Sequence, residues 1–137
     1  MKHINKVNYV DKAEEAIKNL IEYNPKKKKE EIILTTSKIR NILMMVTDLY
    51  NEAIRCKEEQ LSSDIVSRVK YIKMRLVYEI GRDITSKEDL GIEKFANSAK
   101  LLEIIDSIGY SREDLILFCK YMEALVAYHK YYGGKDK

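Results

Sequence analysis

The chain has 137 residues, of which 45% are hydrophobic and 34% charged, and its 25 basic and 22 acidic side chains give a formal charge of +3. This composition excludes a disordered protein, because a chain of this length and hydrophobicity can bury a core of its own. Five glycines and one proline are too few for the closely spaced turns of a β-sandwich or barrel. We therefore predict an all-α fold, a single compact helical domain over residues 1–137, with flexible tails at 1–10 and 133–137.

The apolar runs of the chain are short, and the longest, such as Ile42–Val46, have five residues. A bilayer span needs about 20, so no membrane segment is expected. No basic stretch followed by an apolar run opens the chain. The cysteines, Cys56 and Cys119, are far apart and belong to no Cys/His cluster. The sequence therefore favours a cytoplasmic protein with reduced thiols, no metal site and no cofactor.

The first predicted helix covers residues 11–23. Asp11 is a suitable N-cap, and Asn24-Pro25 ends the helix because the residue before proline is forced out of the α region. A run of four lysines, Lys26–Lys29, follows. Two interpretations of this run remain open: a solvated loop, or a tether that faces phosphate groups.

The remaining predicted helices follow from apolar stripes at spacings of three and four. The clearest runs from Thr35 or Thr36 to about residue 55, the next covers 62–80 with Gly81 as its left-handed end, and 83–91 form an interruption or a short turn. A helix over 92–108 and a last helix after the cap Ser111 complete a bundle of about five helices. The expected core includes Ile42, Val46, Ile72, Leu76, Ile105, Phe118, Met122 and Leu125.

No pattern in the sequence indicates catalysis. His3 lies near the terminus, and His129 lies on the apolar stripe of the last helix, where the helix dipole favours a protonated ring and the ring can cap a carbonyl. Neither histidine has a nucleophile near it in the sequence, and no glycine-rich phosphate-binding pattern is present. We therefore predict a protein that is not an enzyme.

The helix over 62–80 carries the most distinctive pattern. Arg68, Tyr71, Arg75, Tyr78 and Arg82 recur at spacings of three and four, on a side about 120° from the apolar stripe. Residues 65–82 hold five basic side chains against one acidic side chain. Guanidinium groups fit phosphate oxygens and tyrosine rings stack on bases, which favours an RNA-binding surface. Alternatively, the arginines pair with acids on a neighbouring helix while the tyrosines pack against their stems.

Tyrosines crowd the last helix, where four of the ten in the chain lie: Tyr121, Tyr128, Tyr131 and Tyr132. Such a cluster suits a subunit interface, since tyrosine combines an apolar ring with a polar tip. Ordinary half-burial of the same rings is the alternative.

Three segments are similar to a known family: residues 34–43 (LTTSKIRNIL), 71–82 (YIKMRLVYEIGR) and 121–134 (YMEALVAYHKYYGG). Together they resemble the small helical subunit of the type III-A CRISPR–Cas (Csm) effector complex, over roughly residues 32–134. The resemblance implies a five-helix protein without catalytic activity. It also implies copies that stack into a filament beside the backbone subunit and line the channel where guide RNA pairs with target RNA.

The resemblance places basic residues of two matching segments near RNA. Lys38 and Arg40 point about 160° apart on a helix, so both are not expected to touch one strand. A helical adaptor with protein partners alone is the alternative, in which Arg75 and Arg82 form ion pairs. Tyr128 and Tyr132 are candidates for interface contacts. With Arg68 from the basic stripe, the candidate RNA-binding residues are Lys38, Arg40, Arg68, Lys73, Arg75 and Arg82.

Overall fold

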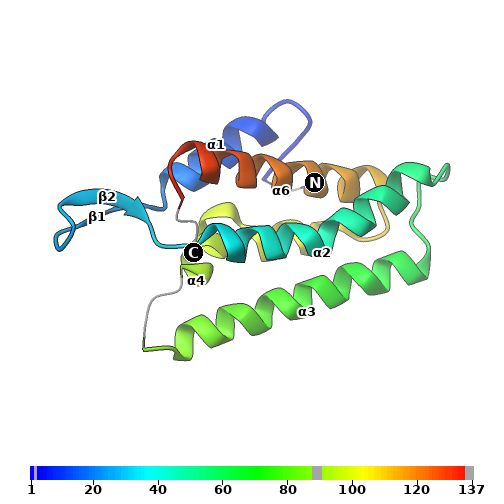
Figure 1. Ribbon diagram of the computed structural model, residues 1–137. Coiled ribbons are helices and arrows are strands. Elements are labelled where there is room, and N and C mark those ends of the chain that lie inside the picture. Colours follow the sequence, from blue (N-terminus) through cyan, green and yellow to red (C-terminus); the bar gives the residue numbers. More distant parts are fainter. Residues whose placement is uncertain (2, 88–90, 135–137) are drawn as a thin grey trace.

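Three long helices determine the arrangement of the chain in the computed structural model, which describes residues 1, 3–87 and 91–134. Helix α6 packs against both α1 and α2, while α3 lies on the other side of α2 (Figure 1). Of two short helices, α4 packs against α1 and α3, and α5 packs against α6 and α3. In chain order the elements are α1 (Tyr9–Lys18), β1 (Ile21–Asn24), β2 (Lys29–Ile32), α2 (Thr36–Arg55), α3 (Ser63–Thr85), α4 (Ile92–Ala99), α5 (Leu101–Ile108) and α6 (Arg112–Tyr131).

The predicted helix starts at Thr35, Ser62 and Ser111 and the predicted core are confirmed, whereas the first helix begins at Tyr9, before the predicted cap Asp11. The hydroxyl of Thr35 accepts a hydrogen bond from the amide of Lys38 at 3.3 Å, and that of Ser111 accepts one from the amide of Asp114 at 3.1 Å. These side chains satisfy amides of the first helical turn that have no partner within the helix. All eight predicted core residues are buried: Ile42, Val46, Ile72, Leu76, Ile105, Phe118, Met122 and Leu125.

The prediction of a helix through residue 23 is wrong. Helix α1 ends at Lys18, and β1 then pairs antiparallel with β2, with Ile21 opposite Ile32 and Asn24 opposite Lys29. Isoleucine and tyrosine favour extended backbone, and the four-residue turn between the strands completes a hairpin. The fold is therefore mostly helical, with one small hairpin in the described part of the chain. The four lysines are exposed at its tip, as the solvated-loop interpretation expected.

Helix α3 continues through Gly81 to Thr85, so the prediction that it ends near Ile80 is wrong. Gly81 does not take the left-handed conformation. The helix continues past it to Asp83, whose side chain is buried. The carboxylate of Asp83 accepts a hydrogen bond from the amide of Glu93 at 2.8 Å, which ties the last turn of α3 to the start of α4. Of the predicted interruption at 83–91, residues 88–90 lie outside the described residues, as do 135–137 of the predicted C-terminal tail.

The helix predicted over 92–108 is two helices, α4 and α5, separated at Lys100. Lys100 takes the left-handed conformation with φ of 55° and ψ of 40°. The break frees backbone carbonyls near it, and the buried hydroxyl of Tyr121 donates a hydrogen bond to the Ala99 carbonyl at 2.9 Å. The bend is therefore held by a side chain of α6.

Candidate nucleic-acid interface

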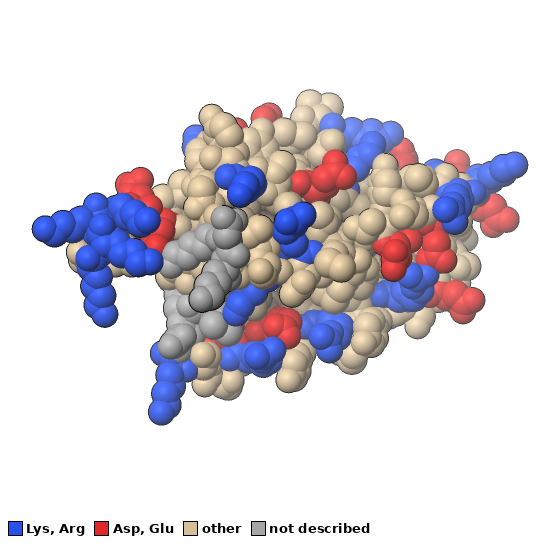
Figure 2. All heavy atoms as spheres, in the orientation of Figure 1, with Lys and Arg blue, Asp and Glu red and all other residues tan. Residues whose placement is uncertain are grey.

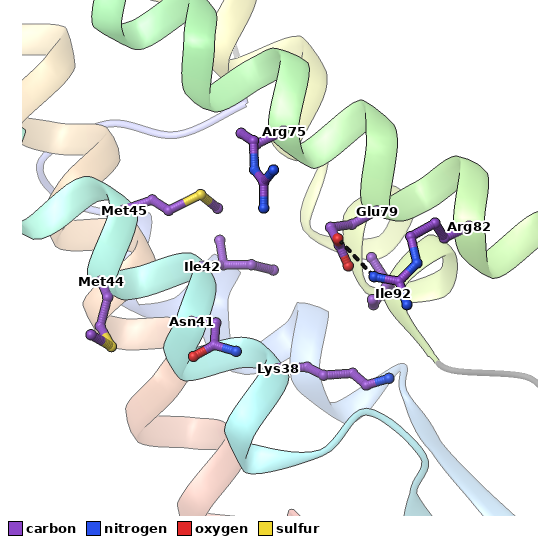
Figure 3. A pocket seen from close by; sticks show the side chains of 9 residues that line it. All are labelled: Lys38, Asn41, Ile42, Met44, Met45, Arg75, Glu79, Arg82 and Ile92. Atoms are coloured by element: carbon purple, nitrogen blue, oxygen red, sulfur yellow. Dashed lines mark hydrogen bonds and ion pairs between the residues drawn. The ribbon is translucent and has the colours of Figure 1, made fainter.

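A groove of about 610 Å³ lies between the first half of α2 and the second half of α3. Figure 3 shows that α3 directs Arg75 towards α2, above the apolar side chains of Ile42 and Met45, while Lys38 lies near the start of α2. The lining residues of each helix face the groove together, because residues three or four positions apart lie on the same side of a helix. The lining residues are Lys38, Asn41, Ile42, Met44, Met45, Arg75, Glu79, Arg82 and Ile92.

The cations of the groove outnumber its acid. The Arg82 guanidinium lies 3.3 Å from the Glu79 carboxylate and 5.9 Å from the centre of the Tyr78 ring. Within the described part of the chain, neither Arg75 nor Lys38 forms an ion pair. Three basic side chains therefore face one carboxylate, over a floor that is partly apolar. Such an arrangement attracts an anion that also carries a flat apolar surface.

Two of the candidate RNA-binding residues hold helices together instead of lining the groove. Arg68 forms an ion pair with Glu52 of α2, and Lys73 forms one with Asp106 of α5. The alternative in which arginines of this helix pair with acids on a neighbouring helix thus applies to Arg68, and Lys73 is paired in the same way. Arg40 is exposed and does not line the groove, in keeping with its expected divergence from Lys38. The structure brings together Lys38, Arg75 and Arg82.

The methionines of the groove were not predicted from the sequence. Met45 forms part of the floor, and Met44 is 69% exposed at the edge. A large apolar side chain on the polar side of an amphipathic helix is a signal that could have found Met44. Met45 is partly buried, so its place depends on where α3 crosses α2, and the pattern of α2 alone does not contain that information.

The two tyrosines predicted at an interface are partly engaged within the chain. The Tyr132 hydroxyl donates a hydrogen bond to the Glu14 carboxylate of α1 at 2.5 Å, and this bond raises the pKa of Tyr132 to about 12. The Tyr128 and Tyr132 rings stack with their centres 6.4 Å apart. Tyr131, beside them, is 76% exposed. An interface role for Tyr128 and Tyr132 stays a prediction.

His129 is buried, with 1% of its surface exposed, and it lies 2.7 Å through Nε2 from the Leu34 carbonyl. Burial lowers the pKa of His129, so the expectation of a protonated ring is wrong. The expected contact with a carbonyl exists, but the carbonyl precedes α2 and is not at the end of α6. Cys119 is also buried, which raises the pKa of its thiol to about 12 and makes the thiol unreactive.

The described residues hold neither a metal-binding cluster nor a membrane-spanning helix. Among those that the structure describes, no group of three or more histidine, cysteine or acidic side chains is placed to hold a metal ion. No helix within this part of the chain combines the length and the hydrophobicity needed to cross a membrane.

Comparison with known proteins identifies the family. A family model described as Csm2 of type III-A matches residues 12–135. The chain belongs to the Csm2 family. Relatives named CRISPR system Cms protein Csm2 include one from Streptococcus thermophilus, 47% identical over 129 residues and covering 94% of both chains. Another, from Mycobacterium tuberculosis, is 41% identical over 111 residues, covering 81% of this chain and 85% of the relative. A third, from Enterococcus italicus, is 30% identical over 114 residues, covering 79% and 77%.

The Csm2 family model matches from residue 12, whereas the resemblance seen in the sequence began at about residue 32. The match is thus about 20 residues longer at its N-terminal end. It therefore includes the β1–β2 hairpin as well as the groove. The hairpin and its lysines lie between the bounds of the residues that the Csm2 family model matches.

Proposed function

We propose that this chain is the non-catalytic small subunit of the type III-A Csm interference complex and acts in the cytoplasm. Its copies stack into a filament beside the backbone subunit and position guide RNA and target RNA during antiviral defence. The observation that carries the proposal is the groove between α2 and α3, where Arg75 and Lys38 have no carboxylate partner within the described residues. Membership of the Csm2 family supports the choice of complex.

Phosphate contacts explain the arrangement of the groove better than protein contacts alone. In the protein-only adaptor, Arg75 and Arg82 would be expected to form ion pairs. Arg82 does so with Glu79 at 3.3 Å, but in the described structure Arg75 does not. A guanidinium over an apolar floor can bind a phosphate through paired hydrogen bonds while a base covers the floor.

A single copy should bind RNA weakly. For single-stranded RNA, each phosphate contact contributes about −0.7 to the slope of log binding constant against log salt concentration. Two to four contacts should therefore give a slope of about −1.4 to −2.8. Phosphates carry no base information, so the effect of losing one contact should be alike for all sequences. An array of copies multiplies these contacts along one RNA.

The test replaces Arg75 and Arg82 by glutamate and measures RNA capture by the reconstituted complex at several salt concentrations. Lys70→Glu with Lys120→Glu is the matched control, because both lysines are exposed, lie outside the groove and give the same change in charge. We expect the groove variant alone to weaken capture and flatten the salt dependence, with helicity unchanged. Equal capture by both variants, with the wild-type slope, would favour the protein-only adaptor.

A further inference from the structure

The β1–β2 hairpin projects from one end of the molecule, beyond the ends of the surrounding helices (Figure 1). Its base is fixed: Ile32 is 1% exposed, and Glu22 of β1 forms an ion pair with Lys94 of α4 at 2.8 Å. Strands of four residues span about 13 Å. The hairpin therefore holds its tip at a defined distance from the body.

The tip is organised by its own hydrogen bonds. The Asn24 side-chain oxygen accepts bonds from the amides of Lys26 at 2.9 Å and Lys27 at 3.4 Å. Lys28 takes the left-handed conformation, with φ of 54°. The turn is thus formed before any partner arrives, which reduces the entropy lost when a ligand binds.

Residues 21–32 hold four lysines, all at the tip, and three acids, of which Glu30 adjoins Lys29. All four lysines of the tip are exposed, and only Lys27 forms an ion pair among the described residues, with Glu31 at 3.7 Å. Two of the hairpin's acids are occupied nearer the body, Glu31 by Asn24 and Lys27, and Glu22 by Lys94. Figure 2 shows the basic atoms outermost at this end and acidic atoms between them and the body.

An exposed aromatic side chain lies on the same hairpin, three residues before the first lysine of the tip. Tyr23 of β1 is 61% exposed and pairs across the hairpin with Glu30. An exposed tyrosine next to a group of ammonium ions is the combination that binds single-stranded nucleic acid, because the ring stacks on a base while the cations hold the phosphates.

We propose that the lysine-tipped β1–β2 hairpin is a second contact with RNA, separate from the groove, that binds the phosphodiester backbone through Lys26–Lys29 and stacks Tyr23 on a base. This inference rests on the proposed function, because the hairpin would bind the same RNA that the groove is proposed to bind. Lysine ammonium groups act as point charges on flexible stems, so the contact is independent of sequence. Each copy would then hold RNA at two separated points.

The test measures binding of a fluorescently labelled uridine homopolymer to the full chain at increasing salt. The hairpin variant is Lys26→Gln with Lys28→Gln, and the matched control is Lys57→Gln with Lys120→Gln, two exposed lysines outside the hairpin. A second variant replaces residues 25–28 by Asn-Gly, a preferred two-residue turn that keeps the strands paired while shortening the tip. Arg75→Gln with Arg82→Gln serves as the groove variant.

We expect the hairpin variant to reduce the steepness of the salt slope by about 1.4, since each lost phosphate contact removes about 0.7. The control should keep the wild-type slope, and the shortened hairpin should lose affinity to a similar extent. RNA carrying 4-thiouridine should crosslink to Tyr23. If the hairpin variant loses affinity and the groove variant does not, the hairpin contact stands while the proposed groove is wrong.

Three outcomes would overturn the inference. A hairpin variant with the wild-type slope, beside a groove variant with a reduced slope, would remove the hairpin contact and leave the proposed function intact. A hairpin variant that binds RNA normally but no longer joins the other Csm subunits would make the hairpin a protein contact. A wild-type chain and complex that show no salt-dependent RNA binding would remove both proposals.

Discussion

Gly91, at the start of α4, should be one of the least replaceable residues of the fold. It has a φ of +80°, and a Cβ added there would lie 2.7 Å from the backbone nitrogen of Leu34 and 3.0 Å from its Cα. Leu34 cannot retreat easily, because its side chain is buried and its carbonyl is bonded to His129 at 2.7 Å. Substitution by alanine therefore forces backbone against backbone.

The expected loss has two parts. An L-residue in the left-handed conformation costs about 1–2 kcal/mol, and displacing well-packed atoms costs about 1–3 kcal/mol more. Gly133→Ala is the matched control, because Gly133 has a φ of +81° and a Cβ there would meet no atom within 4 Å. The two variants share the conformational cost, so the free energy of unfolding of Gly91→Ala should be lower by about 1–3 kcal/mol.

Urea titration followed by far-ultraviolet circular dichroism measures this difference, provided that the unfolding is two-state. A domain of this size has a total stability of about 5–15 kcal/mol, so the difference is large enough to resolve. Equal losses in the two variants would show that the loop before α2 yields to the added methyl group. The reasoning that Leu34 is fixed from two sides would then be wrong.

Two further predictions concern buried polar groups. Tyr121→Phe should lower the free energy of unfolding by about 1–3 kcal/mol, measured by the same titration, because the Ala99 carbonyl at the α4–α5 break loses its buried donor. The pKa of His129 is lowered in the folded protein, so the unfolded chain binds the proton more tightly. The contribution of neutral His129 to the free energy of unfolding is therefore complete above pH 6.5, the ordinary pKa, and is lost as the pH falls from 6.5 towards the folded-state pKa. Unfolding titrations at several pH values should show His129→Gln to be less sensitive to this change, and equal sensitivity would contradict the assignment.

Local signals in the sequence predict the long helices well. Helix α2 has both a hydroxyl cap at Thr35 and a regular apolar stripe, so two independent features agree on where it begins and which side it buries. The break at Lys100 has no such signal, since lysine is a good helix former and neither glycine nor proline stands beside it. Its cause is tertiary: α4 and α5 must each bury a separate apolar side.

The hairpin was missed because its strands are short and the helix before it has a compatible apolar pattern. The sequence predicted that Asn24-Pro25 ends a helix, whereas it lies where β1 ends and the turn of the hairpin begins. The candidate site shows the same limit. Spacing placed Arg68 and Arg75 on one side of α3, but only the neighbouring helices decide that Arg68 meets Glu52 while Arg75 faces the groove.

The bond between His129 and Leu34 joins positions 95 residues apart. Closing a loop of that length costs about 4 kcal/mol of chain entropy, so this contact should form late in folding. At a synthesis rate of about 5–20 residues per second, a ribosome needs roughly 5–20 s to proceed from Leu34 to His129. Throughout that interval the Leu34 carbonyl lacks its partner His129, and Gly91, which packs against Leu34, is made only 57 residues after it. The bond that fixes the backbone just before α2 can therefore form only after nearly the whole chain has been made.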